Sequence, residues 1–254
     1  MADTDRQTTL VTPRIERVSQ LGGETEVPVQ NSSEAAWTQD ISGRQWVIKW
    51  ENNTGVEPLL AEAICWLLGE SLGVPQPKVA VFSDGIRWAW MSERIPQVVH
   101  WDPERVDLLI NHLDFGATLA LDAISHNEDR HSGNILLQPA PDELRLRAYA
   151  IDSGTALVGW PDFHALGMGV PNPRNLARGL PVALLKEGAL LAAAKATAMQ
   201  SDYLMSLVVE ACMIARNDSV VQLHGMLWQR LSNAPALVEA YLQKILLSQA
   251  LGAT

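Results

Sequence analysis

The chain has few cysteines and no long apolar run, and each shortage excludes a class of protein. Its 254 residues include two cysteines, Cys65 and Cys212, far apart in apolar segments of helical pattern. Such a pair forms neither a disulfide framework nor a structural zinc site, so we expect two small buried hydrophobic residues. No apolar run approaches the roughly 20 residues that span a bilayer. The polar first residues predict no signal peptide, so we expect a cytoplasmic protein without integral membrane association.

Positive charge is also scarce. The 19 lysine and arginine residues face 29 aspartate and glutamate residues, which gives a formal net charge of −10. An acidic chain disfavours binding to the phosphate backbone of nucleic acid and to anionic membranes. We therefore expect no nucleic-acid partner. The length suits one large domain or two lobes around a cleft.

The most informative pattern is Asp129-Arg130-His131-Ser132-Gly133-Asn134, followed downstream by Ile151-Asp152-Ser153-Gly154. The interval from Asp129 to Asn134 equals that between the base and the metal-binding amide of a protein-kinase catalytic loop. In phosphoryl transfer, one carboxylate orients the acceptor hydroxyl, while an amide and a second carboxylate hold Mg²⁺. A solvated turn is the alternative for one such peptide. Three groups in the right order favour Asp129 as the base, and Asn134 and Asp152 as ligands of the Mg²⁺ that accompanies ATP.

Neighbouring residues allow several further interpretations. His131 is either a donor to the transferred phosphoryl group or a hydrogen-bonded loop residue, and both alternatives stay open. Arg130 is expected to pair with a carboxylate or a carbonyl. Asp114-Phe115-Gly116 spells the kinase metal motif, but it precedes the catalytic loop within an apolar helical run. His126-Asn127-Glu128 matches part of a zinc-deaminase signature, yet the required Pro-Cys-x-x-Cys is absent from the sequence.

Upstream residues supply a candidate nucleotide anchor. Lys49 ends the segment Trp46-Val47-Ile48-Lys49, which is typical of the strand whose lysine binds nucleotide phosphates. Glu62 lies on the following helical segment, where it is our choice for the ion-pair partner of Lys49, and Glu57 is the competing choice. Gly22-Gly23 is a candidate phosphate loop, although paired glycines are also common in turns.

The hydrophobic pattern changes along the chain from strands to helices. Short antiparallel strands are expected over 18–50, before a helix from Glu57 to near Gly73. A long loop, poorly periodic and rich in glycine and proline, is expected from Gly154 to Pro181, and we expect acceptor selection to lie there and in the helical tail. The remaining expected elements are a hairpin over 78–91, a helix over 106–125, a second hairpin over 135–151 and helices over 182–251.

Together, Asp129-Arg130-His131-x-x-Asn134 and Ile151-Asp152-x-Gly154 resemble the catalytic and metal-binding pair of the phosphoinositide 3- and 4-kinase superfamily. The context from Leu121 to Arg130 is similar to that of the small HipA-like kinases of bacteria. This resemblance implies an α+β, bilobal protein-kinase-like fold, with a small β-rich lobe over 1–93 and a mostly helical lobe over 94–254. Its hinge would lie at Met91-Ser92-Glu93.

The resemblance also implies an activity. The expected reaction is ATP- and Mg²⁺-dependent transfer of the γ-phosphoryl group to a hydroxyl, either of a protein serine or threonine or of a small molecule. An antitoxin-like or regulatory protein is an implied partner. A pseudokinase, a nucleotide-binding interaction module and a nucleotidyl transferase are the alternatives, because one fold can support several chemistries.

Overall fold

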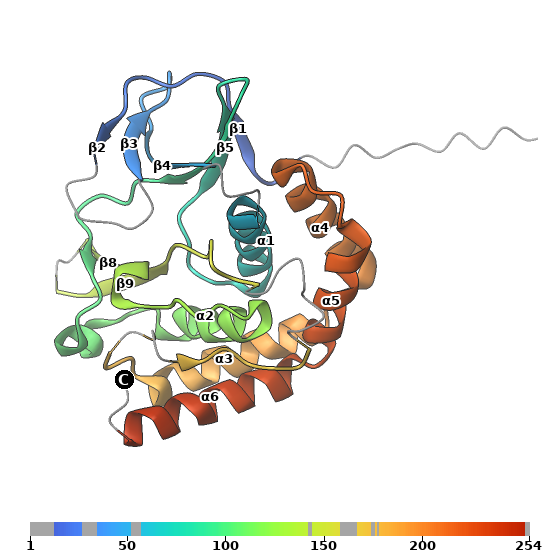
Figure 1. Cartoon of the computed structure of the whole chain (residues 1–254). Coiled ribbons are helices and arrows are strands. Elements are labelled where there is room, and N and C mark those ends of the chain that lie inside the picture. Colours follow the sequence, from blue (N-terminus) through green and yellow to red (C-terminus); the bar gives the residue numbers. More distant parts are fainter. Residues whose placement is uncertain are drawn as a thin grey trace, which may run out of the picture.

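The chain is an α+β protein with a β-sheet N-terminal part and a helical C-terminal part (Figure 1). The computed structural model describes residues 13–26, 35–51, 57–141, 144–157, 167–173, 176 and 178–251. None of the helices in these ranges combines the length and apolar character needed to cross a membrane.

A six-stranded sheet forms the N-terminal part. Its order is β1-β5-β6-β4-β3-β2, and all neighbouring strands are antiparallel except β1 and β5. The antiparallel strands expected over 18–50 are confirmed for β2, β3 and β4, whereas β1 pairs with β5 in parallel. Glu93 ends β6, and the predicted lobe boundary after it stays a prediction. The strands are β1 (Glu16–Val18), β2 (Thr25–Glu26), β3 (Ala36–Gln39), β4 (Gln45–Trp50), β5 (Val79–Ser83) and β6 (Trp88–Glu93).

Alternation along β4 decides where its lysine points. Side chains of successive strand residues point to opposite faces of a sheet. Trp46 and Ile48 are fully buried in a cluster with Ala80, Ala89 and Met91 on one face. Lys49 therefore projects from the other face, toward helix α1 (Glu57–Leu72).

The predicted helix after β4 is confirmed as α1. Its apolar residues recur at three and four positions, and Leu60, Ile64 and Leu67 are buried. The helix ends where the Gly73 N–H bonds the carbonyl of Gly69, and Gly73 adopts φ +87°, a conformation that glycine tolerates best.

Within the described residues, a small sheet and five α-helices build most of the C-terminal part. The sheet order is β7-β8-β9, with both pairs antiparallel. Helix α2 packs on α3 and α6, and the predicted helical tail is confirmed. The elements are β7 (Val99–His100), β8 (Ile135–Pro139), β9 (Leu146–Ala150), α2 (His112–Ser125), α3 (Val182–Thr197), α4 (Ser201–Ala215), α5 (Val220–Ser232) and α6 (Ala234–Ala250).

The expected helix over 106–125 is wrong in its first part. A 3₁₀ helix over Pro103–Leu108 is followed by Leu109, which forms a bridge with Leu146. The carboxamide of Asn111 then binds both backbone groups of Ala148, each at 2.9 Å. The Asn111 side chain thus completes the backbone hydrogen bonding of Ala148 on β9. Residue 111 is not part of a helix, and α2 begins at His112.

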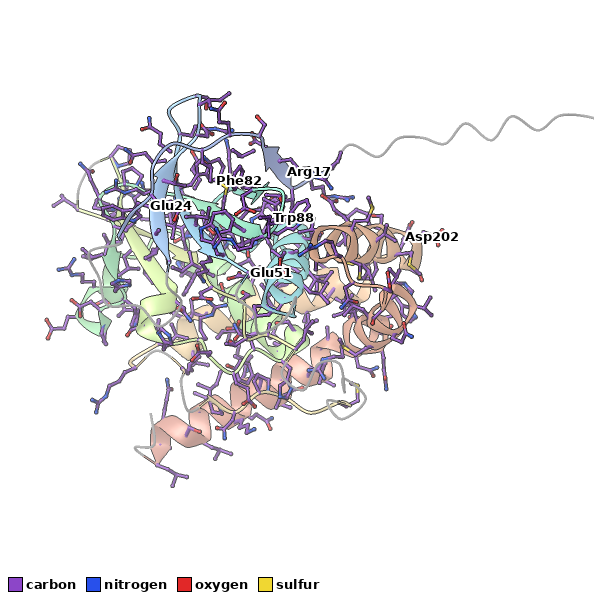
Figure 2. The ribbon with its side chains drawn as sticks, turned by 45° about the horizontal axis from the view of Figure 1, so that its top comes forward. Arg17, Glu24, Glu51, Phe82, Trp88 and Asp202 are labelled. Atoms are coloured by element: carbon purple, nitrogen blue, oxygen red, sulfur yellow. The ribbon has the colours of Figure 1, made fainter. Side chains whose placement is uncertain are left out.

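Helix α4 also contacts the N-terminal sheet. The carboxylate of Glu210 accepts hydrogen bonds from the backbone N–H groups of Arg14 and Ile15, and α4 packs against α1. At the end of α4, Arg216 pairs with Glu51. Figure 2 shows Arg17, Glu51 and Trp88 together where the sheet approaches α4. The two parts are therefore joined along α4 as well as through the connection after β6.

Both cysteines are buried, as predicted. Cys65 lies in α1 and Cys212 lies in α4. Burial raises the pKa of the Cys65 thiol to about 12 and that of Cys212 to about 11. Neither thiol carries the thiolate character that reactive cysteines need.

Candidate functional site

Three charged side chains from separate elements meet beside β4. The ammonium of Lys49 lies 3.2 Å from Oε1 of Glu62 on α1 and 2.8 Å from Oδ1 of Asp152, which follows β9. Burial opposes the charged form of Lys49, but the two carboxylates outweigh it and raise the pKa of the lysine. Burial also raises the pKa of Glu62, and the positive charge of Lys49 offsets only part of this increase. The structure thus brings together Lys49, Glu62 and Asp152, and Glu62 is a partner of Lys49, whereas the side chain of the competing choice, Glu57, lies outside the described part of the chain.

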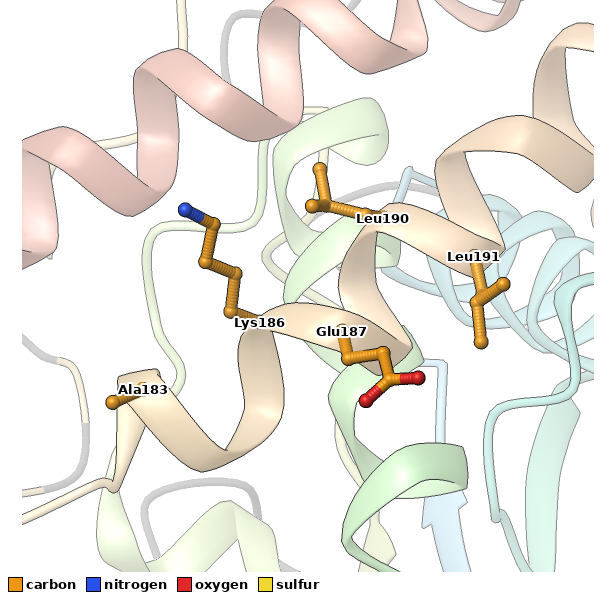
Figure 3. A pocket seen from close by; sticks show the side chains of 5 residues that line it. All are labelled: Ala183, Lys186, Glu187, Leu190 and Leu191. Carbon is orange, nitrogen blue, oxygen red and sulfur yellow. The ribbon is translucent and has the colours of Figure 1, made fainter.

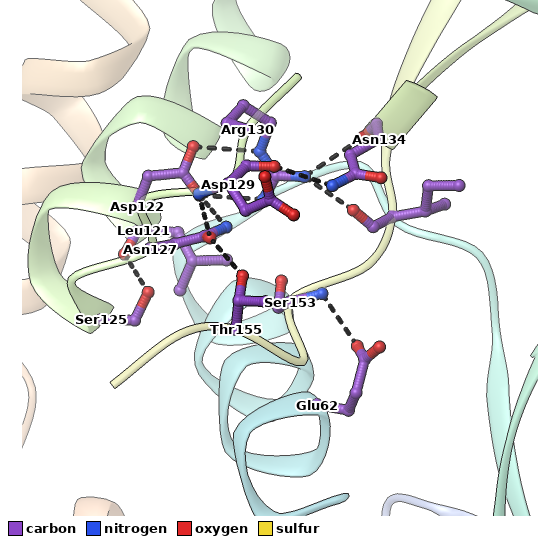
Figure 4. A network of polar contacts seen from close by, with 11 residues as sticks. Glu62, Leu121, Asp122, Ser125, Asn127, Asp129, Arg130, Asn134, Ser153 and Thr155 are labelled. Atoms are coloured by element: carbon purple, nitrogen blue, oxygen red, sulfur yellow. Dashed lines mark hydrogen bonds and ion pairs between the residues drawn. The ribbon is translucent and has the colours of Figure 1, made fainter. Parts of the chain in front are cut away.

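The backbone turns sharply at Asp152. This residue adopts φ +58°, a left-handed conformation that costs a non-glycine residue energy and persists at functional sites. The backbone N–H of Ser153 donates to Oε2 of Glu62 at 3.0 Å, which fixes the turn against α1 (Figure 4). The positive φ belongs to Asp152 and not to the glycine two residues later.

The catalytic-loop candidates follow α2 directly. The amide nitrogen of Asn134 donates to the backbone carbonyl of Asp129 at 2.8 Å (Figure 4). The carboxamide oxygen is therefore the atom left to coordinate a metal. The Asp129 side chain is about a third exposed, at 36%, so its carboxylate is accessible to an acceptor. Nδ1 of His131 accepts a hydrogen bond from the Gly133 N–H, and its Nε2 lies 3.8 Å from Oδ2 of Asp129. The contact with Gly133 is the loop bond expected in one of the two interpretations of His131.

Arg130 links the catalytic loop to the metal loop. Its buried guanidinium forms two parallel bonds to the carboxylate of Asp122 on α2, at 3.0 and 2.8 Å. It also donates to the carbonyl of Asn134 at 3.2 Å and to that of Ile151 at 2.7 Å. The prediction that Arg130 pairs with a carboxylate or carbonyls is confirmed. Since Ile151 precedes Asp152, one side chain sets the position of both loops.

Two polar residues that the sequence did not single out complete this network. Asp122 is fully buried on the apolar side of α2, and the amide of Asn127 donates to it at 2.9 Å. The Asn127 oxygen then accepts from the backbone N–H of Asp129 at 3.1 Å (Figure 4). A buried charge must be paired and hydrogen-bonded. The signal in the sequence is an aspartate within an apolar helical pattern.

The proposed glycine loop lies elsewhere. The Gly22 N–H bonds the carbonyl of Gln39, and Gln39 pairs with Gln45 at the opposite end of β4 from Lys49. Lys49 lies four residue steps along β4 from Gln45, a distance of about 13 Å. The structure therefore does not bring Gly22 and Gly23 to the Lys49 cluster. The connection between β2 and β3, residues 27–34, lies outside the described residues.

The hinge candidates end the central strand β6. Met91 is fully buried on the face opposite Lys49, so its side chain points away from the cluster. Ser92 pairs with Val47 and lies on the Lys49 side of the sheet, and Glu93 pairs with Trp46. Their hinge role stays a prediction.

The donor set fits magnesium better than a metal held entirely by protein. Within the described residues, no group of three or more His, Cys, Asp and Glu side chains is arranged to hold a metal ion. Mg²⁺ normally takes one or two carboxylates and completes its shell with substrate phosphates and water. The carboxylate of Asp152 and the carboxamide of Asn134 are donors of the kind that Mg²⁺ prefers, and Lys49 would supply a cation for such phosphates.

A separate hollow on the surface carries no such chemistry. It lies along α3 (Figure 3), and its residues come later in the sequence than those of the charged cluster. Its side chains come from one helix, and none is a predicted site residue. They are Ala183, Lys186, Glu187, Leu190 and Leu191.

Comparisons with known proteins place the fold. No protein-family model and no curated protein matches the chain. The Helicobacter pylori proinflammatory kinase CtkA is similar in structure, with a TM-score of 0.61 and 12% identity, over 90% of this chain and 99% of CtkA. HipA, from the Shewanella oneidensis complex with HipB and operator DNA, matches with a TM-score of 0.50 and 12% identity, over 90% of this chain and 67% of HipA. At this identity the likeness shows the fold alone, and the chain has the α+β fold of these two kinase-like neighbours.

Proposed function

We propose that this protein is an ATP- and Mg²⁺-dependent kinase that transfers the γ-phosphoryl group to a hydroxyl. The observation that carries this proposal is the placement of Lys49 between the carboxylates of Glu62 and Asp152. A lysine paired with a helix glutamate and next to a metal-binding aspartate is the arrangement that protein kinases use for phosphoryl transfer. The kinase-like fold supports the same conclusion.

Each residue has a part in the proposed reaction. Lys49 binds the nucleotide phosphates, and Glu62 keeps its ammonium in position. Asn134 and Asp152 are the residues that would hold Mg²⁺, and the ion would supply positive charge to the phosphates. Asp129 orients the acceptor hydroxyl and takes its proton as the new P–O bond forms and ADP leaves. His131 lies near Asp129 and is a candidate donor to the transferred group.

We also propose a class of acceptor and a protein partner. A protein serine or threonine is the leading acceptor, and a small-molecule hydroxyl is the second. The HipA neighbour belongs to a toxin-antitoxin system and is seen with HipB. By analogy, we propose that an antitoxin-like or regulatory protein binds this chain, in the cytoplasm, where ATP is available.

The proposal is tested by comparing two aspartate variants with a matched chemical change. Wild type, Asp129→Asn and Asp114→Asn are incubated with γ-labelled ATP, Mg²⁺ and casein as the protein acceptor. Loss of a positioned general base lowers the rate by about 10²- to 10⁴-fold, so Asp129→Asn should lose transfer to that extent. Asp114 is exposed on α2, in the sequence that imitates the metal motif, and its variant should match wild type. Equal loss in both variants would contradict the assignment of Asp129.

A further inference from the structure

The segment 167–173 is held against the end of α2 by side chains from three elements. Arg230 on α5 donates to the carbonyls of Gly167 and Gly169, at 2.7 and 2.9 Å. Lys244 on α6 donates to the carbonyl of Pro171 at 3.1 Å. His126, which ends α2, contacts the carbonyl of Gly169 at 3.3 Å. Within the described residues, no strand or helix pairs these carbonyls, and the buried Arg230 and the half-buried Lys244 supply the donors instead.

Arg230 is unusual because it is fully buried and its partners are carbonyls. Burial lowers the pKa of Arg230 to about 10. Besides the segment, it donates to the carbonyls of Ile124 and Ala123, at 2.6 and 2.8 Å. These carbonyls belong to the last turn of α2, where unpaired C=O groups and the helix dipole favour a cation. The guanidinium therefore joins the segment to the helix that leads into the catalytic loop.

The segment also contacts the residue next to the proposed base. The backbone N–H of Asn172 donates to Oε1 of Glu128 at 3.3 Å, and Glu128 immediately precedes Asp129. The same carboxylate oxygen lies 3.3 Å from Nε2 of His126. The segment, the end of α2 and the start of the catalytic loop thus form one connected unit.

We propose that Arg230 and Lys244 are positioning residues that hold segment 167–173 as a preformed wall of the acceptor site beside Asp129. This inference rests on the proposed kinase function. Both side chains act through backbone carbonyls and lie on helices that supply none of the nucleotide-binding candidates. Their removal therefore weakens acceptor binding and leaves ATP binding intact.

The test combines hydrogen exchange with kinetics on the full chain. It compares wild type, Lys244→Met, Arg230→Lys and the control Lys186→Met, in which an exposed lysine of α3 receives the same change as Lys244. Loss of a hydrogen bond to a charged group corresponds to a change of about tenfold or more. Amide exchange across 167–173 should rise by about that factor in Lys244→Met and, to a smaller extent, in Arg230→Lys. Exchange in β4 and α1 should not change.

Kinetics supply a readout that a general loss of stability would not produce. With casein as acceptor, the KM for casein should rise about fivefold to tenfold in Lys244→Met, while the KM for ATP stays within twofold of wild type. Lys186→Met should match wild type in both constants. Unchanged exchange in 167–173, or an equal rise in β4 and α1, would overturn the inference. A wild-type chain that transfers no phosphate would contradict the proposed function alone, and exchange would then decide on the two positioning residues.

Discussion

Lys49 lies between two carboxylates that come from distant parts of the sequence, Glu62 and Asp152. The carboxylates compensate the charge of a largely buried lysine, and the lysine in turn keeps two acidic groups close together. The pairing of Lys49 with Glu62 could be predicted, because a strand-end lysine and a helix glutamate follow each other in a known order. The contact with Asp152 required the fold, since the turn after β9 has to reach the ammonium of Lys49 on β4.

Replacing this lysine should remove nucleotide binding rather than the fold. In Lys49→Met, we expect the KM for ATP to rise at least tenfold, because the phosphates lose their cation and face Glu62 and Asp152 unshielded. Steady-state ATP turnover and nucleotide titration measure the effect. Lys78→Met removes an exposed lysine just before β5. It should leave the KM for ATP and the affinity from nucleotide titration unchanged. Equal ATP affinity in Lys49→Met and wild type would contradict the anchor role.

Asp152 should make stability depend on acid pH. Burial opposes its ionisation, but Lys49 outweighs burial and lowers the pKa of Asp152 below its ordinary value of 3.8. The stabilisation is therefore present above pH 3.8 and is lost as the pH falls through the lower pKa of the folded state. Asp152→Asn lacks this contribution, while asparagine tolerates the left-handed backbone. Urea unfolding should show a stability difference between wild type and variant that shrinks in acid. A difference that grows in acid would contradict this account.

Residue patterns predicted the kind of partner that Arg130 would have, but not which carboxylate and which carbonyls. The spacing of Asp129 and Asn134 could be recognised in the sequence, because both the residue types and the interval between them are read directly from it. The bidentate contact between Arg130 and Asp122 depends on burial, which only the packed structure provides. The positive φ of Asp152 was equally invisible, because a strained conformation is imposed by its surroundings.

Among the secondary-structure elements, α2 and α3 approach each other through two glycines. A Cβ atom on Gly188 would lie 1.9 Å from the carbonyl oxygen of Leu113, and one on Gly116 would lie 2.3 Å from that of Leu185. Such contacts are far inside van der Waals distance. The glycine of Asp114-Phe115-Gly116 therefore serves helix packing, which explains why these letters occur without a metal site. Periodicity could predict both helices, but it could not reveal where their backbones touch.

A glycine-to-alanine pair tests this close approach. Gly188→Ala should lower the free energy of unfolding by about 1–3 kcal/mol, because the backbone of α2 would have to shift. Gly225→Ala is the matched control, since a Cβ at this helical position meets nothing within 4 Å. It should stabilise the protein by up to about 1 kcal/mol, through the greater helix propensity of alanine. Thermal or urea unfolding measures both variants. A neutral Gly188→Ala would contradict the tight contact between α2 and α3.

For the whole molecule, the sequence could predict the α+β division but not how the chain closes on itself. Helix α4 belongs to the helical tail, yet it packs on α1 and binds the backbone just before β1 through Glu210. Alternation and period identified strands and helices, whereas the parallel pairing of β1 with β5 depends on contacts between distant segments. The candidate site is built from both parts of the molecule. Lys49 and Glu62 come from the N-terminal part, and the helical part contributes Asp129, Asn134 and Asp152.

The central claim is that this assembled site transfers the γ-phosphoryl group of ATP. The most direct measurement incubates the wild-type chain with Mg²⁺ and casein, with ATP labelled at the γ position in one sample and at the α position in the other. The account predicts label on protein from γ-labelled ATP only, and its loss in Asp129→Asn. Label from the α position, or transfer that survives in Asp129→Asn, would contradict it.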